Sequence, residues 1–150
     1  MTFTNASLLT SAAIMAAAFT LGISVPTTPA GAKELKIATF MGPPHFLNRV
    51  AFTNLAKAIG KATGGETTAK LYASGQLGKG PVQQFKRVID NVAEISFGIQ
   101  GYTSTIFPRT MVVAQPGVGI TAVEITKKFW GVYDKFLKSE YTKIKVLGLW

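Results

Sequence analysis

ELKIATFMGPPHF, residues 34–46, is the stretch that decides the fold. Residues 35, 37 and 39 alternate with residues 36, 38 and 40, which predicts a β-strand, and the Gly-Pro-Pro that follows predicts a loop before a helix. In an open α/β sheet, ligands bind outside the carboxyl ends of the strands, where loop N–H groups and helix N-termini favour anions. The loop after this strand is therefore the first candidate binding element.

The same strand-loop-helix unit recurs along the chain. Apolar residues three and four apart predict three helices, over residues 46–63, 82–92 and 123–141. Gly64-Gly65 ends the first of them. Further β-prone runs predict strands over residues 67–72, 94–99, 109–114 and 145–150. We therefore expect an α/β fold with a largely parallel five-strand sheet flanked by helices.

The first 32 residues carry no charged residue and differ in composition from the rest. Residues 7–25 are apolar, and Ala30-Gly31-Ala32 has the small-x-small pattern of a signal-peptidase site. We expect a signal peptide over residues 1–32, with cleavage between Ala32 and Lys33. An uncleaved membrane anchor is the alternative, although this Ala- and Thr-rich run is weakly apolar for a membrane span.

All 16 Lys and Arg and all 7 Asp and Glu lie in residues 33–150, so the net charge of +9 belongs to that part. Such an excess suits an anionic ligand, an acidic surface or nucleic acid. The basic residues are scattered, however, with adjacent pairs only at Lys86-Arg87 and Lys127-Lys128. This pattern is typical of a solvated basic surface, and we expect no nucleic-acid partner.

Two glycine-rich stretches partly match nucleotide-binding motifs. Residues 73–80, ASGQLGKG, have Ala73 where a phosphate-binding P-loop has glycine, and Gly80 where it has Ser or Thr to bind magnesium. Residues 117–122 spell G-x-G-x-x-A, but Pro116 precedes them and no acidic residue ends the next predicted strand. Neither stretch predicts a nucleotide site.

The chemically reactive residues do not form a catalytic set. His45 is the single histidine, cysteine is absent, and the seven acids are dispersed without metal-ligand spacing. We therefore expect no enzymatic activity, no cofactor and no metal ion.

Several segments, taken in order, resemble the solute-binding subunit of tripartite ATP-independent periplasmic (TRAP) transporters of the DctP type. They are ELKIATFMGPPH at residues 34–45, LYASGQLG at 71–78, VIDNVAEISFG at 88–98, GYTSTIFP at 101–108, FWGVYDKFLKSEY at 129–141 and KVLGLW at 145–150. The resemblance extends over residues 33–150.

This resemblance implies a periplasmic-binding-protein-like (type II) fold, in which two α/β lobes joined by a hinge close on an organic anion. Residues 33–150 would be the N-terminal lobe, with an incomplete sheet and with the hinge and second lobe outside this sequence. The implied function is a periplasmic subunit that captures a small organic acid and delivers it to the membrane subunits of a TRAP transporter for secondary-active uptake. A small basic protein that binds an anionic surface or nucleic acid is the alternative.

The resemblance also carries five pocket positions onto this chain, namely Phe40, His45, Gly80, Ile99 and Tyr102. Members that bind heavily hydroxylated sugar acids have polar or charged side chains at these places. The residues here predict an apolar floor suited to a carboxylate with a branched, ring or aromatic body. The Tyr102 hydroxyl and His45 would supply the polar contacts. Ordinary core packing is the alternative role for Phe40 and Ile99.

Overall fold

The structure is a computed structural model that describes residues 31–150. The predicted signal peptide, and the membrane anchor that is its alternative, lie outside the described residues except for the last two positions. No helix within residues 31–150 is long and apolar enough to cross a membrane.

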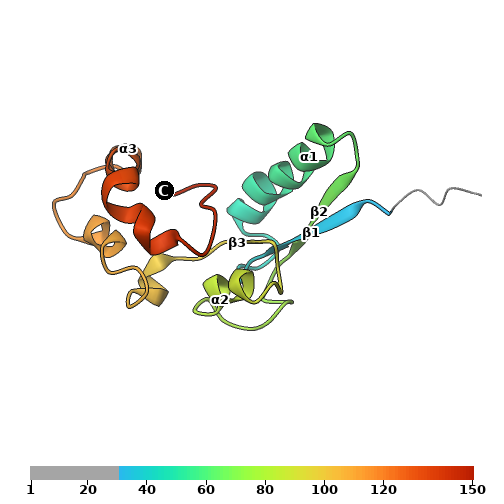
Figure 1. The fold of residues 1–150 in the computed structure, drawn as a ribbon, viewed down its shortest axis with the longest axis horizontal. Coiled ribbons are helices and arrows are strands. Elements are labelled where there is room, and N and C mark those ends of the chain that lie inside the picture. The colour runs from blue at the N-terminus through green and yellow to red at the C-terminus, as the bar shows by residue number, and fades with distance from the viewer. Residues whose placement is uncertain (1–30) are drawn as a thin grey trace, which may run out of the picture.

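The first half of the described chain is built around a parallel sheet (Figure 1). Its strands lie in the order β2-β1-β3, and they are β1 (Lys33–Ala38), β2 (Thr67–Tyr72) and β3 (Ile95–Ser96). β1 pairs with β2 along its whole length, whereas β3 pairs with β1 only through Ile95 and Ser96. Because the pairing is parallel, the carboxyl ends of all three strands lie at the same edge.

Helices lie on both sides of this sheet (Figure 1). The π-helical segment η1 (Leu47–Phe52) leads directly into α1 (Thr53–Ala62) on one side, and the short α2 (Gln84–Ile89) lies on the other. α1 ends before Gly64 and Gly65, which both adopt positive φ angles of 60° and 89°, as the predicted stop requires. The core of this half is the buried cluster of Ile37, Met41 and Phe52.

The second half of the described chain is helical. It contains η2 (Gln100–Thr103) and η3 (Thr110–Ala114), both 3-10 helices, followed by α3 (Ala122–Val132), the π-helical η4 (Tyr133–Leu137) and the 3-10 helix η5 (Lys138–Tyr141). The last three run on without a break, so the helix predicted over residues 123–141 is confirmed. The buried residues of this half form a second cluster of Phe107, Phe129, Leu137, Tyr141 and Leu149.

The strand predicted over residues 109–114 is wrong, because this segment forms η3. The carboxylate of Glu140 accepts the N–H of Arg109 (2.6 Å), the N–H of Thr110 (3.0 Å) and the Thr110 hydroxyl (2.7 Å). These bonds satisfy N–H groups at the start of a helical turn. The local sequence pattern does not contain this partner, which lies 30 residues further along the chain.

The strand predicted over residues 145–150 is also wrong, since this segment has no regular structure. Leu149 is buried in the helical cluster, and its carbonyl oxygen accepts the indole N–H of Trp130 at 3.1 Å. The segment therefore packs on the helices instead of extending the sheet. Among residues 31–150 the sheet has three strands and not the expected five, within an α/β architecture that agrees with the prediction.

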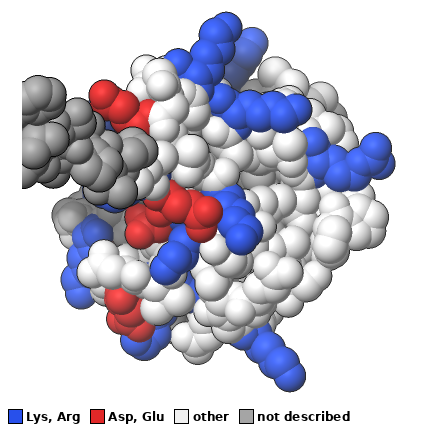
Figure 2. Space-filling model, turned by 90° about the vertical axis from the view of Figure 1, so that its right-hand side faces the viewer, with Lys and Arg blue, Asp and Glu red and all other residues white. Residues whose placement is uncertain are grey.

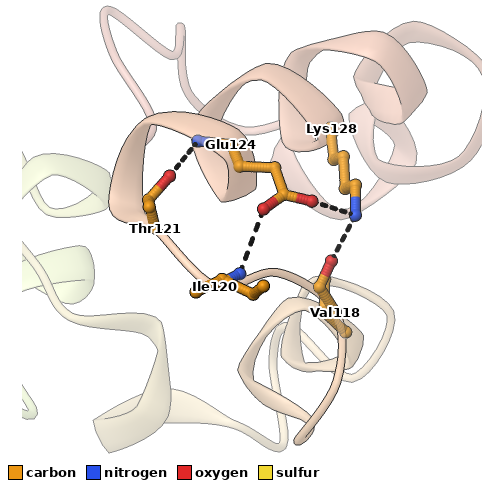
Figure 3. Close-up of polar contacts among 5 residues, drawn as sticks. All are labelled: Val118, Ile120, Thr121, Glu124 and Lys128. Atoms are coloured by element: carbon orange, nitrogen blue, oxygen red, sulfur yellow. Dashed lines mark hydrogen bonds and ion pairs between the residues drawn. The ribbon is translucent and has the colours of Figure 1, made fainter.

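The glycine-containing run at residues 117–122 leads into α3, which begins at its last residue (Figure 3). The Thr121 hydroxyl accepts the N–H of Glu124 at 3.1 Å, and the Glu124 carboxylate accepts the N–H of Ile120 at 3.1 Å. Lys128 joins the Glu124 carboxylate (2.7 Å) to the Val118 carbonyl oxygen (2.7 Å). The run follows a 3-10 helix, so it lacks the strand-loop-helix setting of a dinucleotide-binding turn.

Candidate functional site

The loops that follow β1 and β2 are bonded to each other at the carboxyl edge of the sheet. The Gly75 N–H donates to the Thr39 carbonyl oxygen at 3.0 Å, and the Ser74 N–H donates to the Met41 carbonyl oxygen at 2.8 Å. Phe97, the first residue after β3, donates its N–H to β1. All three strand ends are therefore fixed relative to one another by backbone bonds.

Asn48 fixes the loop that carries Phe40 and His45. Its side chain is 1% exposed, and its Nδ2 donates to the carbonyl oxygens of Met41 (3.0 Å) and Gly42 (2.7 Å). A buried amide that bonds two successive carbonyls holds a turn firmly, because breaking it would leave buried polar groups unpaired. Asn48 is not among the predicted site residues.

Two predicted site residues, Phe40 and Tyr102, are in contact. Their ring centroids are 6.1 Å apart and the rings are nearly perpendicular, at 89°. Phe40 is also stacked on Phe97 (6.1 Å, 25°), and Phe97 is stacked on Trp150 (5.8 Å, 20°). These geometries are attractive for aromatic pairs. We call Phe40, Phe97, Tyr102 and Trp150 the aromatic row.

The aromatic row has both a packing role and an accessible side. Phe40 is half-buried and packs against the cluster of the sheet half, so the core-packing alternative holds for part of its surface. Tyr102 is 50% exposed and Trp150 is 65% exposed. Phe97 and Trp150 are not among the predicted site residues, although Phe97 lies within a segment predicted as a strand that ends at this edge.

Ile99 lies on a cleft between the two halves of the structure. The cleft has a volume of about 350 Å³, and residues of both hydrophobic clusters line it, including Phe52, Phe97, Phe107, Tyr141, Leu149 and Trp150. Figure 1 shows the C-terminal segment on one side of this region and α1 on the other. Among the five predicted site residues, only Ile99 lines this cleft.

His45 and Gly80 are exposed on the loops after β1 and β2. His45 Nδ1 accepts the N–H of Leu47 at 3.2 Å, which directs the ring toward the start of its own helix. Gly80 adopts a φ of +84°, and no atom lies within 4 Å of the place a Cβ would occupy. Within the described residues, no hydrogen bond joins either residue to the aromatic row.

Arg87 holds the loop that contains Gly80. It is 6% exposed, and its guanidinium donates to the carbonyl oxygens of Gly78, Lys79 (2.8 Å) and Gly80 (3.4 Å). No carboxylate among the described residues pairs with it, and burial lowers the pKa of Arg87 because the charged form loses hydration. The prediction of a solvated surface for the pair Lys86-Arg87 is therefore wrong for Arg87.

The remaining basic side chains are spread over the surface. On the face drawn in Figure 2, they project from several separate places with uncharged surface between them. The described residues contain no group of three or more His, Cys, Asp and Glu side chains arranged to hold a metal ion. The chemistry that the site supports is therefore the binding of an apolar or aromatic body beside polar loops.

The sequence matches no family model and no curated protein. Solved structures do match the described fold, and three of them are TRAP solute-binding proteins. The described chain has the fold of TRAP solute-binding proteins. One match comes from an unidentified marine microbe, is specific for aromatic acids and holds 3-hydroxybenzoate, with a TM-score of 0.72 at 25% identity. A variant of it with metahydroxyphenylacetate gives 0.73 at 25%.

A third TRAP solute-binding protein, from Rhodoferax ferrireducens, holds copurified benzoate and matches with a TM-score of 0.71 at 28% identity. Each match covers 77% of this chain but only 36% of the TRAP protein it was compared with. The chain thus spans about a third of the length of these TRAP proteins. The lobe boundaries and the five pocket residues remain predictions.

Proposed function

We propose that this chain belongs to a periplasmic solute-binding subunit of a TRAP transporter of the DctP type, and that its ligand is a small aromatic carboxylate. Residues 33–150 would form the N-terminal lobe after removal of the signal peptide at Ala32 and Lys33. The subunit would capture the acid and deliver it to the membrane subunits, without chemistry of its own.

The observation that carries the proposal is the aromatic row at the carboxyl edge of the sheet. Phe40 and Tyr102 were predicted to contribute to an apolar floor, and their rings touch at this edge. Three solved structures with this fold, from two proteins, hold benzoate, 3-hydroxybenzoate or metahydroxyphenylacetate, which are all aromatic acids. An edge-to-face or stacked contact with the row suits such a ring better than a sugar acid.

Polar contacts would come from the loops that frame the row. The Tyr102 hydroxyl and the His45 ring are the predicted partners for hydroxyl or carboxylate oxygens, and Ile99 and Gly80 are the other predicted contacts. The net charge of +9 favours an anionic ligand in general. In the whole subunit, contact of the ligand with both lobes would favour the closed state.

Titration calorimetry of the purified chain with benzoate, 3-hydroxybenzoate and gluconate tests the proposal. We expect the two aromatic acids to bind with dissociation constants of about 1 mM, because one wall of a cleft supplies only part of the binding energy. Gluconate, which has no apolar body, should not bind measurably. Binding of gluconate as tight as that of benzoate would contradict the proposal.

Variants locate the binding to the aromatic row. Tyr102→Ala should weaken benzoate binding about fivefold or more, since it removes one aromatic contact. Phe46→Ala is the matched control, because Phe46 is a 67% exposed aromatic residue on the loop after β1 that makes no aromatic pair among the described residues. Equal effects of the two substitutions would show that the row does not hold the ligand.

A further inference from the structure

Hydrogen bonds from the side chain of Arg87 determine the shape of the loop at residues 78–80. Three successive carbonyl oxygens, from Gly78, Lys79 and Gly80, all accept hydrogen bonds from the buried guanidinium of Arg87. The side-chain Nε2 of Gln84 adds a further bond to the Gly80 carbonyl oxygen at 3.3 Å. All three carbonyl oxygens of the loop therefore face Arg87 and accept hydrogen bonds.

The opposite side of the same peptide units must present N–H groups. The described chain contains no cis peptide bond, and in a trans peptide the C=O and the following N–H point in opposite directions. Because the Gly78 and Lys79 carbonyls face Arg87, the N–H groups of Lys79 and Gly80 point away from it. Neither N–H donates a hydrogen bond to any described residue.

The open conformation of the loop and the basic residues near it suit the binding of an anion. No atom lies within 4 Å of the place a Cβ would occupy at Gly80, and positive φ angles at Gly78 (+126°) and Gly80 (+84°) produce the folded loop. Backbone N–H groups on neighbouring residues of such a loop form anion-binding concavities. A hollow on the Arg87 side of the loop is lined by Lys79, by Arg87 and by Lys86, whose charge is paired with Asp90, so the surroundings of the loop carry a net positive charge.

We propose that the backbone N–H groups of Lys79 and Gly80 bind the carboxylate of the ligand, and that Arg87 is the positioning residue that aims them. This inference rests on the proposed function and adds the group that recognises the anion. In this proposal Arg87 itself does not touch the ligand, because it is buried and both terminal nitrogens of its guanidinium donate to the loop carbonyls. Its role is to keep two backbone donors pointed outward before the ligand arrives, which lowers the cost of ordering the loop on binding.

NMR titration of the amide resonances of the purified chain tests this recognition. The probes are acetate, benzoate and benzamide, the last being a neutral analogue of benzoate. We expect the amide protons of Lys79 and Gly80 to shift downfield and saturate with acetate and with benzoate, and to stay unchanged with benzamide. Absence of these shifts with acetate, or an equal response to chloride, overturns the inference.

Three substitutions test whether Arg87 acts by positioning the loop or through its charge alone. Arg87→Gln should weaken acetate binding at these amides about fivefold or more, because the loop carbonyls lose their shared donor. Lys86→Gln removes the same charge from the neighbouring exposed residue and should change acetate binding by less than about twofold. Arg87→Lys, which keeps a cation with three donors, should restore part of the affinity. Equal weakening by Arg87→Gln and Lys86→Gln overturns the positioning role.

A further variant covers the case in which Arg87→Gln does not fold. A Cβ at Gly78 would lie 3.0 Å from Arg87 Nη2 at a backbone φ of +126° that L side chains rarely adopt, so Gly78→Ala separates the loop from the guanidinium without removing its charge. It should reduce the acetate response as Arg87→Gln does, and an unchanged response would contradict the inference.

The outcomes also distinguish this inference from the proposed function. Benzoate shifts at Tyr102 without shifts at Lys79 and Gly80 would overturn the inference and leave the aromatic-acid proposal standing. Acetate shifts at Lys79 and Gly80, combined with gluconate binding as tight as benzoate, would support the anion site and contradict the aromatic ligand.

Discussion

Glu140 shows how a single side chain decides local structure in this protein. Burial by itself would raise the pKa of its carboxyl, but the hydrogen bonds from the Arg109 N–H and from the hydroxyl and N–H of Thr110 outweigh burial and lower it. The Thr110 hydroxyl also bonds the Tyr141 hydroxyl at 2.9 Å, and burial raises the pKa of Tyr141. Glu140 thus connects the start of η3 to the end of η5.

Glu140→Gln should lower the free energy of unfolding near neutral pH by roughly 1–3 kcal/mol, because the partly buried Thr110 donors and the Arg109 N–H lose a charged acceptor. A carboxyl with a lowered folded-state pKa stabilises the fold above its unfolded value of about 4.3, and this stabilisation is lost as the pH falls through the folded pKa. Urea denaturation at several pH values would show a shallower acid-side decline for the variant.

Glu66→Gln is the control for Glu140→Gln. Glu66 is exposed, and its side chain makes no hydrogen bond within the described residues. It should leave both the stability and its pH dependence nearly unchanged. If the two variants behaved alike, net charge and not the bonds to η3 would explain the effect of Glu140.

At the scale of elements, the start of α3 gives the sharpest prediction. Thr121→Ala removes the hydroxyl that accepts the Glu124 N–H and should destabilise the protein by about 1 kcal/mol. Thr121→Ser keeps the acceptor and should cost only a few tenths of that. Thermal denaturation of the two variants checks this, and equal losses would mean that the methyl group matters more than the cap.

The elements that were predicted correctly are determined by short-range patterns in the sequence. The period-two residue pattern predicted β1 and β2, and apolar residues three and four apart predicted α1 and the long helical run from α3 to η5. Gly64-Gly65 predicted the end of α1. The segments at 109–114 and 145–150 were mispredicted because their conformations depend on distant partners, Glu140 for the first and Trp130 for the second. β-propensity is weak against such tertiary contacts.

In the candidate site, too, some residues could be predicted and others depend on tertiary contacts. The resemblance placed Phe40 and Tyr102 where the structure brings their rings together, but the other members of the row, Phe97 and Trp150, follow from packing. Arg87 could not be recognised from the sequence, because an arginine beside a lysine usually indicates a surface. Its burial depends on three loop carbonyls that no side-chain pattern reveals.

At the scale of the whole molecule, the two hydrophobic clusters are separated by the 350 Å³ cleft and should open separately. Phe52→Ala should weaken hydrogen-exchange protection of β1 and α1 by about 3–5 kcal/mol, and Phe107→Ala should do the same for α3 through η5. Both phenylalanines are buried, so each variant is the control for the other. Equal loss of protection in both halves, from either substitution, would show one cooperative unit.

Arg87 has a further consequence for behaviour in acid. Glu94 accepts the N–H of Lys36 at 2.7 Å, and this contact, like those of Glu124 and Glu140, depends on a carboxylate whose pKa is lowered. These contacts weaken once the carboxylates take up protons. A guanidinium keeps its proton throughout the range in which water-soluble proteins are studied. On acidification, the contacts of these three carboxylates should therefore weaken first. The loop at residues 78–80 should keep its hydrogen bonds to Arg87 and remain folded in acid.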